Sequence, residues 1–312
     1  MKIYINGKFY PEKEAKISVF DHGFLYGDGV YETLRTYNGQ LFRYADHYRR
    51  LSNSAKLISL KLPIKQKEMQ QVIETAIQKN GLKEARIRVS ISRGSGKVGL
   101  DTSLCPKPTI VIMATEFKPM PAELYRKGVK LIVAETIRNH SQAINPAIKS
   151  TNFLNNILAK IEARKAKAFD AIMLNWQGYV AETTIANLFI IKDGKLLTPP
   201  LEVGILNGIT RQMVINCAEK LKIPFKEKPF KAKELLEADE CFLTNTSGEV
   251  IPVSKIGNKS FPIGKITKEL HLCFRRMLLC PPEQTEKFGF FLSIIIYIKA
   301  AICLIPAQMK MK

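Results

Sequence analysis

Lys149 is the residue whose type and setting most directly suggest chemistry in this sequence. It follows Pro146 and precedes the segment Ser150-Thr151-Asn152, whose side chains can accept hydrogen bonds from the first N–H groups of a helix. We therefore expect a helix to begin in this segment and Lys149 to occupy a strand-to-helix junction. Such a junction commonly faces a ligand cleft, where a partly desolvated ammonium can lose its proton and become a nucleophilic amine. The alternative interpretation is an ordinary solvated lysine.

The residues that follow support the predicted helix. Apolar side chains recur there with the i, i+3, i+4, i+7 spacing of one helical face, at Leu154, Ile157, Leu158 and Ile161. The spacing predicts an amphipathic helix that buries this stripe. Lys149 lies outside the stripe.

A second segment, Gly204–Arg211, offers donors for a phosphate group. It runs directly into a predicted helix from about Ile209 to Leu221. Gly208 would let a ligand approach the backbone closely, and the free N–H groups at the helix start and the Thr210 hydroxyl would point at that ligand. In the alternative, purely local interpretation, Asn207 serves as the helix N-cap and Gly208 as a turn residue.

Glu182 ends an apolar strand, Tyr179–Glu182, instead of lying in a polar loop. A buried carboxylate needs a partner. A protonated heterocycle nitrogen would be such a partner, and the carboxylate would in turn favour the charged form of that nitrogen. The alternative is an exposed glutamate at the end of a strand.

A turn of small residues between two predicted strands supplies further donors. Thr246 and Ser247 offer hydroxyls, and the turn offers bare N–H groups, to an anionic ligand. An ordinary polar hairpin explains this segment equally well by itself. Together, however, the three segments and Lys149 supply an amine for an aldehyde, donors for a phosphate and a carboxylate for a ring nitrogen. That combination suits pyridoxal 5′-phosphate.

The composition is that of an ordinary globular protein with room for two domains. The chain has 312 residues, of which 46% are hydrophobic. Its six cysteines include no C-x-x-C pair, and the N-terminus shows no basic segment followed by an apolar signal core. We therefore expect a reduced, cytoplasmic protein. None of the four histidines stands in a metal-type spacing, so no metal site is expected.

The net charge of +20 raises nucleic-acid binding as a hypothesis from another class. The basic residues are spread along the chain, however, and no arginine-rich arm, zinc-finger spacing or interleaved aromatic pattern accompanies them. Nucleic acid is therefore not expected as the main partner and stays a remote alternative. The surplus of positive charge would equally favour small anionic ligands.

The hydrophobic pattern predicts two domains that would position these groups. Residues 1–116 are interpreted as a small α+β domain, in which an Asn6-Gly7 turn joins two short strands. The other elements expected there are helices at 44–60 and 64–80 and strands at 85–93 and 109–114. A proline-containing break at 117–122 places the linker at 117–126.

A larger domain is expected over residues 127–277. Its predicted strands lie at 129–133, 171–175, 179–182, 187–191, 241–244 and 250–256, and a further helix is expected at 265–277. Asp193-Gly194 marks another hairpin. The tail, 278–312, does not continue this pattern of helices and strands. Its apolar run at 288–298 is too short for the roughly 20 residues of a spanning helix, so we interpret the tail as an added interaction element or a frameshifted end, and expect no membrane span.

With these motifs in place, the chain resembles the class IV aminotransferases. This fold-type IV pyridoxal-phosphate family contains branched-chain aminotransferases, D-amino acid aminotransferases and aminodeoxychorismate lyases. The resemblance runs from Met1 to about Met277, and its motifs stand in family order: Asp21–Glu32, His47–Leu51, the Lys149 segment, Glu182–Phe189, Leu206–Arg211 and Thr244–Val253. It implies a small α+β domain, a larger α/β domain of pseudo-barrel form, the cofactor between them, and at least a homodimer.

The resemblance also implies a role for each candidate residue. Lys149 would be the Schiff-base lysine and the proton shuttle, and Glu182 would pair with the pyridine nitrogen. Tyr31 would lie on the substrate side at the mouth of the cleft. Four residues would bind the phosphate: Arg50, Ile209, Thr210 and Thr246.

The motifs that bear on the substrate point in more than one direction. Arg93–Asp101 is similar to a segment of many branched-chain enzymes, and this segment lacks the Arg-x-His pair with which typical D-amino acid enzymes hold a carboxylate. Arg86, however, stands where the best-known branched-chain enzymes carry a tyrosine, and Phe153 replaces a tyrosine that usually reaches the cofactor ring oxygen. Thr183–Ala186 also departs from the usual glycine-rich sequence.

We expect transfer of the amino group from a branched-chain L-amino acid to 2-oxoglutarate. D-amino acid transamination and aminodeoxychorismate cleavage remain open alternatives on the same scaffold. The N–H groups of the turn that contains Ser247 would take the substrate carboxylate, while an apolar pocket takes the side chain. Arg86 would pair with the distal carboxylate of glutamate, because one pocket must accept apolar and acidic side chains in turn.

Overall fold

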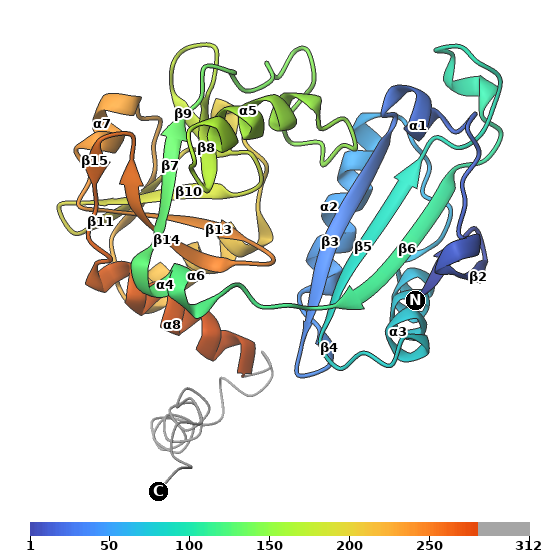
Figure 1. Ribbon diagram of the computed structural model, residues 1–312, viewed down its shortest axis with the longest axis horizontal. Helices are drawn as coiled ribbons and strands as arrows, with labels where there is room; N and C mark the ends of the chain where they lie inside the picture. Colours follow the sequence, from blue (N-terminus) through green and yellow to red (C-terminus); the bar gives the residue numbers. More distant parts are fainter. Residues whose placement is uncertain (280–312) are drawn as a thin grey trace, which may run out of the picture.

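The structure, a computed structural model, describes residues 1–279, and the interpretation of the tail therefore lies almost wholly outside the described residues. The chain forms two lobes, each built on one β-sheet, and a single extended segment joins them (Figure 1). Within residues 1–279, no helix is long and apolar enough to cross a membrane.

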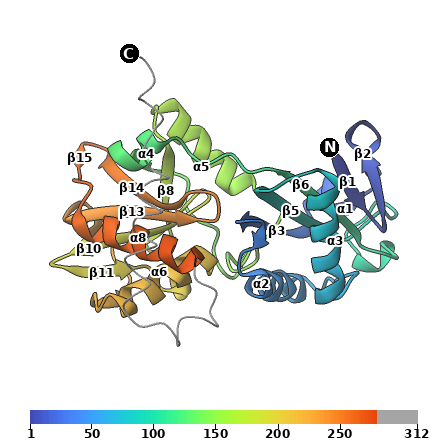
Figure 2. The ribbon, with the colours of Figure 1, turned by 90° about the horizontal axis from the view of Figure 1, so that it is seen from below.

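The first lobe contains a six-stranded antiparallel sheet in the order β2-β1-β6-β5-β3-β4. Two helices, α2 and α3, pack on one face of this sheet, where Leu51, Ile73, Ile87 and Ile112 are buried in a common core (Figure 2). The elements of this lobe are β1 (Lys2–Ile5), β2 (Lys8–Pro11), α1 (His22–Tyr26), β3 (Gly29–Tyr37), β4 (Gln40–Leu41), α2 (Tyr44–Leu57), α3 (Gln66–Lys79), β5 (Ala85–Ser92) and β6 (Thr109–Glu116).

The second lobe contains a curled sheet in the order β12-β11-β10-β13-β14-β7-β8-β9, with β15 paired to β14. β7 runs parallel to both of its neighbours, β14 and β8. The strands are β7 (Val129–Val133), β8 (Asp170–Leu174), β9 (Val180–Thr183), β10 (Asn187–Lys192), β11 (Lys195–Thr198), β12 (Phe225–Glu227), β13 (Glu240–Asn245), β14 (Glu249–Ile256) and β15 (Lys259–Ser260). The helices are α4 (Ala122–Lys127), α5 (Leu154–Lys165), α6 (Ile209–Lys220), α7 (Ala232–Leu236) and α8 (Lys265–Leu279).

The curl of the second sheet and the packing of its helices set the position of the loops. The turn after β9 brings Thr183 and Ala186 together through a 2.8 Å hydrogen bond, so the sheet curls until β9, the last strand of the order, approaches β10. Helices α6 and α8 pack together over β10 and β13, burying Phe189, Phe242 and Phe274. The expected pairing of a small α+β unit with a larger curled-sheet unit is confirmed.

Most of the expected elements are confirmed, with ends that differ by a few residues, but β3 is not among the predicted strands. It lies inside the first sheet, between β5 and β4, and is buried along nearly its whole length. Because both of its faces are covered, it lacks the alternation of apolar and polar residues that marks a half-buried strand. Glu32 and Arg35 interrupt it, and both are buried because ion pairs neutralise them.

The start of the helix after Lys149 differs from the prediction. α5 begins at Leu154 with Phe153 at the N-cap position, and no side chain caps it. Ser150 forms a β-bridge with Val30 instead, which keeps the segment around Lys149 extended. The predicted side-chain cap within residues 150–152 is therefore wrong, because this segment pairs with the first lobe.

The predicted buried stripe of α5 is also wrong. Its four side chains are between 44% and 63% exposed: Leu154, Ile157, Leu158 and Ile161. The buried face of α5 carries Asn156, Ala159 and Ala163 and packs on β8. Small side chains let the helix approach the sheet closely, and the larger apolar residues consequently face outwards.

Candidate active site

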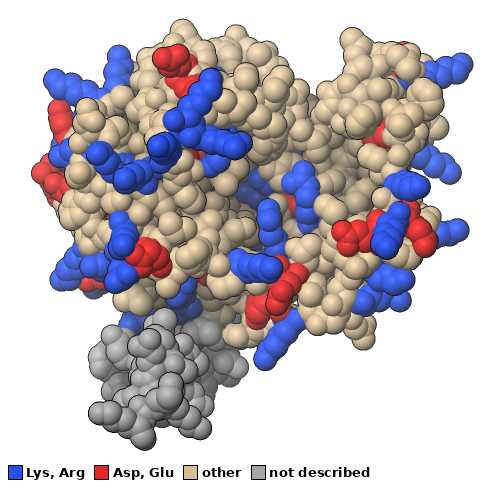
Figure 3. Space-filling model, in the orientation of Figure 1, with Lys and Arg blue, Asp and Glu red and all other residues tan. Residues whose placement is uncertain are grey.

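A cavity of about 460 Å³ lies where the two lobes meet. Figure 3 shows the hollow between the lobes, with Lys and Arg side chains gathered around it. The candidate residues from the sequence all line this one cavity: Tyr31, Arg50, Arg86, Lys149, Glu182, Ile209, Thr210, Thr246 and Ser247. The motifs that are scattered along the chain therefore converge on a single site.

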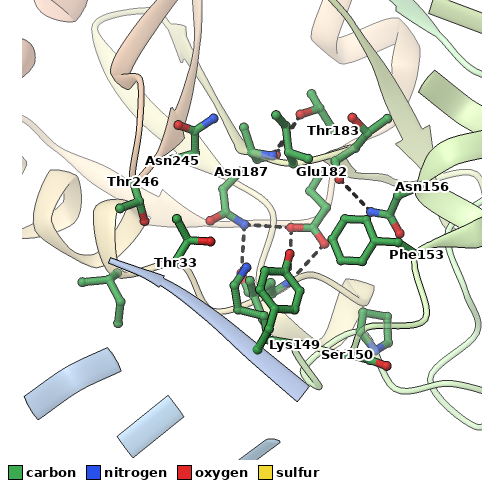
Figure 4. A pocket seen from close by; sticks show the side chains of 18 of the residues that line it. Thr33, Lys149, Ser150, Phe153, Asn156, Glu182, Thr183, Asn187, Asn245 and Thr246 are labelled. Atoms are coloured by element: carbon green, nitrogen blue, oxygen red, sulfur yellow. Dashed lines mark hydrogen bonds between the residues drawn. The ribbon is translucent and has the colours of Figure 1, made fainter. Parts of the chain in front are cut away.

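The backbone of Lys149 is fixed by hydrogen bonds to the first lobe. Its carbonyl accepts a hydrogen bond from the Tyr31 N–H at 2.9 Å, and its own N–H donates to Ser54 Oγ at 3.1 Å. Two residues on, the Thr151 N–H donates to the Gly29 carbonyl at 2.9 Å. These bonds on both sides of Lys149 give its side chain a defined direction, into the cavity (Figure 4).

The surroundings of Lys149 favour its neutral amine. Burial lowers the pKa of Lys149 to about 8, and the positive charge of Arg50 acts in the same direction, against the opposing charges of Glu32 and Glu182. The Lys149 Nζ lies 4.6 Å from the centroid of the Tyr31 ring. A lysine with this pKa is partly deprotonated slightly above neutral pH and can act as a nucleophile. The interpretation of Lys149 as an ordinary solvated lysine is therefore wrong.

Glu182 is a buried carboxylate in the wall of the cavity. It accepts hydrogen bonds from Arg138 Nη2 at 2.9 Å, Asn187 Nδ2 at 3.0 Å and the Leu206 N–H at 3.2 Å. Burial raises the pKa of Glu182, although the charge of Arg138 opposes this effect. The interpretation as an exposed strand-end residue is wrong. A buried carboxylate held in this way can stabilise a protonated ring nitrogen beside it.

Arg138 belongs to this site, although no sequence motif indicates it. It lies between β7 and α5, in a segment without helix or strand periodicity. Besides Glu182 it contacts Asn156, donating from Nη1 to Oδ1 at 3.3 Å. Because both of its partners are remote in sequence, no local spacing could have revealed it.

The start of α6 forms another part of the cavity wall. Gly208 is the N-cap, and no side chain caps this helix, so the first N–H groups of α6 face the cavity beside Ile209 and Thr210. Asn207 is not the N-cap, and the alternative interpretation of this segment fails on that point. A side chain at position 208 would not fit, because a Cβ there would lie 2.0 Å from Asn187 Oδ1. An uncapped helix start of this kind binds phosphate groups.

Arg50 lies beside the start of α6 and is held by hydrogen bonds from two sides. Its Nη1 donates to the Asn207 carbonyl at 3.0 Å, next to the start of α6. Its Nε and Nη2 donate to the two oxygens of Glu32 at 2.6 and 2.8 Å, and His47 also contacts Glu32 at 2.8 Å. The Arg50 charge is therefore rigidly placed where an anion would meet the helix.

The turn of Thr246 and Ser247 differs in one respect from the prediction. The Ser247 and Gly248 N–H groups donate to Asn245 Oδ1, at 3.1 and 2.7 Å. A substrate carboxylate could use these two amides only by sharing or replacing Asn245. The residues Thr246 and Ser247 themselves line the cavity, as the prediction required.

The first lobe supplies the facing wall through β3 and β5. Tyr31 lies there against Phe153, with ring centroids 5.5 Å apart, and burial raises the pKa of its hydroxyl to about 12. Arg88 is not among the candidates from the sequence. Its Cζ lies 4.0 Å from the centroid of the Tyr31 ring, and its side chain is less exposed than that of Arg86. The signal for Arg88 is the alternation of β5, because residues 86 and 88 share one face.

These groups satisfy the chemical requirements of pyridoxal 5′-phosphate. The cavity holds a lysine with a lowered pKa for the aldehyde, an uncapped helix start with Arg50 for the phosphate, and a buried carboxylate for the ring nitrogen. The Thr244 hydroxyl, which also lines the cavity, has no hydrogen-bond partner among residues 1–279. Within the described residues, no group of three or more His, Cys, Asp or Glu is placed to hold a metal ion.

Comparison with known families and relatives agrees with this site. The family described as "Amino-transferase class IV" matches residues 29–256. A Methanocaldococcus jannaschii protein named "Putative branched-chain-amino-acid aminotransferase" is 44% identical over 88% of this chain and 96% of its own length. A D-alanine aminotransferase of Staphylococcus epidermidis is 35% identical, covering 89% and 98% of the two chains. An aminodeoxychorismate lyase of Bacillus subtilis is 34% identical, covering 88% and 94%.

Solved structures give the same picture. A branched-chain aminotransferase from Thermoproteus uzoniensis with norvaline is 36% identical and superposes with a TM-score of 0.85, covering 89% of this chain and 95% of that one. The branched-chain amino acid aminotransferase of Escherichia coli gives a TM-score of 0.82 at 30% identity, covering 93% of this chain and 97% of that one.

Proposed function

Because this chain belongs to the class IV aminotransferases and is a pyridoxal-phosphate-dependent aminotransferase, we propose that it transfers the amino group of a branched-chain L-amino acid to 2-oxoglutarate. The observation that carries the proposal is the convergence in one cavity of the Lys149 amine, the Glu182 carboxylate and the uncapped start of α6. The resemblance to the Methanocaldococcus jannaschii protein supports the choice of donor.

Each residue of the cavity would have a defined task. Bound pyridoxal phosphate supplies an aldehyde for an amine and a ring that withdraws electrons from the substrate Cα–H bond. Lys149 would hold the cofactor and then, as a free amine, remove the Cα proton as a general base. Glu182 would keep the ring nitrogen protonated. Four residues would hold the phosphate: Arg50, Ile209, Thr210 and Thr246.

The lining of the cavity supports both an apolar donor and an acidic acceptor. Apolar side chains that could contact a branched side chain include Met120, Ile144, Ile148, Phe153 and Ile185. Arg88 and Arg86 stand on one face of β5 at the cavity wall, and a guanidinium pairs well with a carboxylate. We assign the distal carboxylate of 2-oxoglutarate primarily to Arg88, because it is the less exposed of the two, with Arg86 outside it.

A substrate screen tests this proposal. The purified protein, with pyridoxal phosphate, is offered L-leucine, L-isoleucine, L-valine and D-alanine, each with 2-oxoglutarate or pyruvate as acceptor. The branched-chain L-amino acids with 2-oxoglutarate should react fastest. Faster transfer from D-alanine, or pyruvate release from aminodeoxychorismate without transamination of either kind, would contradict the proposal in favour of the functions of the relatives at 35% and 34% identity.

We also propose a domain organisation and an oligomeric state for this protein. Residues 1–116 and 127–277 would be two domains joined by 117–126, and the chain would form a homodimer or a higher homo-oligomer. Exposed apolar side chains on the two lobes support association, including those of Phe24, Leu100 and Ile157. The free thiols of Cys105, Cys217, Cys241 and Cys273 fit a reduced, cytoplasmic setting. A monomeric mass by light scattering at micromolar concentration would contradict the oligomer.

A further inference from the structure

Another buried carboxylate, Glu249, lies outside the cavity with four donors around it. Its Oε1 accepts hydrogen bonds from Arg35 Nη1 and Tyr37 Oη, each at 3.2 Å. Its Oε2 accepts from Arg275 Nε at 2.8 Å and contacts His271 Nε2 at 3.0 Å. Burial alone would raise the pKa of Glu249, but the His271 hydrogen bond and the Arg275 charge outweigh it and lower the pKa to about 2. The carboxylate is therefore ionised throughout the physiological range.

The donors come from both lobes. Arg35 and Tyr37 belong to β3 of the first lobe, whereas His271 and Arg275 belong to α8 of the second. The Arg35 guanidinium lies between two rings, 3.8 Å from the centroid of Tyr37 and 3.5 Å from that of Phe117. Phe117 is the first residue after β6, where the chain leaves the first lobe. Glu249 therefore joins the two lobes, and its partner Arg35 packs on Phe117 at the start of the segment that connects them.

Glu249 also anchors the turn that forms part of the cavity. It pairs with Asn245 across the β13–β14 hairpin and adopts a positive φ of 57°. Gly248, just before it, accepts a hydrogen bond through its carbonyl from Tyr125 Oη at 3.1 Å, and the Tyr125 ring stacks on His271. The turn between these anchors carries Thr246 and Ser247, which line the cavity.

The same face of β3 reaches both the cavity and Glu249. Residues 31, 33, 35 and 37 alternate along the strand and therefore point to one side. Tyr31 and Thr33 line the cavity, and Arg35 and Tyr37 hold Glu249. Thr33 and Thr246 are both drawn at the cavity in Figure 4. A change in the Glu249 contacts would consequently move β3 relative to the turn, and with it two walls of the site.

We propose that Glu249 is a positioning residue that fixes the spacing between β3 and the Thr246–Gly248 turn, and thereby the width of the substrate side of the cavity. The inference rests on the proposed function for the roles of Tyr31 and Thr246. Glu249 does not line the cavity, so its influence on substrate and cofactor would be transmitted through the turn and the strand.

A comparison of Glu249→Gln with Glu240→Gln tests this role. Glu240 is a matched control, because it is a buried carboxylate that also holds α8, accepting from the Thr267 N–H at 2.8 Å and from Thr267 Oγ1 at 2.6 Å, without the contacts to β3. We expect both variants to lose thermal stability. Only Glu249→Gln should raise the KM for the amino donor, by about tenfold, with kcat changed by less than about threefold.

Two further measurements keep the test decisive. The dissociation constant of pyridoxal phosphate from the apoprotein, measured by titration, should rise several-fold in Glu249→Gln and not in Glu240→Gln, because Thr246 moves only in the former.

If Glu249→Gln does not fold, Tyr37→Phe removes a single bond from the first lobe and should shift KM in the same direction by a smaller factor. Equal shifts of KM in the Glu249 and Glu240 variants, or an unchanged KM and cofactor affinity in Glu249→Gln, would overturn the inference. If the wild type does not transaminate leucine, the proposed donor is wrong, and the same comparison is made with the donor that it does use.

Discussion

Replacement of Glu182 by glutamine separates its chemical role from its structural one. The amide preserves the shape of the side chain and can still accept a hydrogen bond, but it carries no charge. In the wild type the carboxylate faces Arg138 at 2.9 Å, Asn187 at 3.0 Å and the Leu206 N–H at 3.2 Å. Removing the charge leaves the buried Arg138 guanidinium with one neutral partner, Asn156, besides the new amide.

The two consequences of Glu182→Gln have different sizes. Loss of the charge should destabilise the fold by no more than about 2 kcal/mol, because burial already raises the pKa of Glu182 in the wild type and the amide still fills the site. Turnover should fall by about a hundredfold or more, equivalent to roughly 3 kcal/mol of transition-state stabilisation, because a neutral amide cannot hold the ring nitrogen protonated. Some cofactor should be retained, since Lys149 and the phosphate site are unchanged.

The assay measures kcat at saturating pyridoxal phosphate together with the melting temperature, and Glu240→Gln serves again as the control for the loss of a buried carboxylate outside the cavity. The Glu182 variant should lose far more turnover than the control at a similar loss of melting temperature. Turnover close to the wild-type value in Glu182→Gln would refute the chemical role and leave Glu182 as a structural residue.

Three further predictions follow from the cavity and the chain end. Arg88→Met should raise the KM for 2-oxoglutarate at least tenfold and leave the KM for leucine nearly unchanged, and equal effects on both would contradict the assignment of the distal carboxylate to Arg88. The Lys149 pKa of about 8 is below its unfolded value of 10.5, so the unfolded chain binds more protons between these pH values and the apoprotein gains stability as pH rises through this window. In Lys149→Met, the free energy of unfolding measured by urea denaturation should increase less between pH 7 and pH 10 than it does in the wild type. An increase as large as that of the wild type would refute the lowered pKa of Lys149. Truncation after Leu279 should leave cofactor binding and solubility intact, and a loss of either would show that residues 280–312 belong to the packed protein or its oligomer.

The sequence predicts this site better than it predicts some of the elements that hold it. Glu182 and Thr210 are identified because each lies near the end of an element that the sequence predicts. Lys149 is identified as well, although the helix expected directly after it begins only at Leu154. β3 is not predicted, because Glu32 and Arg35 are buried by partners far away in the sequence, Arg50 and Glu249. Local patterns contain no information about such pairs.

The errors on α5 and at the hairpin have a related origin. Periodicity identifies the apolar face of α5 correctly, but whether that face is buried depends on how closely Ala159 and Ala163 allow the helix to approach β8. At the hairpin, the sequence reveals that Ser247 and Gly248 have N–H groups to offer, yet not that Asn245 Oδ1 accepts from both. Arg138 is missed because its role arises only from contacts with Glu182 and Asn156, which are remote in the sequence, whereas Arg88 is missed although the alternation of β5 places it on the same face as Arg86.

The central claim is that Lys149 is the residue that binds the cofactor covalently. The wild-type protein, purified with pyridoxal phosphate, should show a visible absorption band that disappears on treatment with borohydride, because reduction fixes the cofactor onto the amine that holds it. Digestion and mass spectrometry then identify the labelled lysine. We predict a single labelled peptide that contains Lys149, and the label should be absent from Lys149→Ala. A stoichiometric label on any other lysine would contradict the claim.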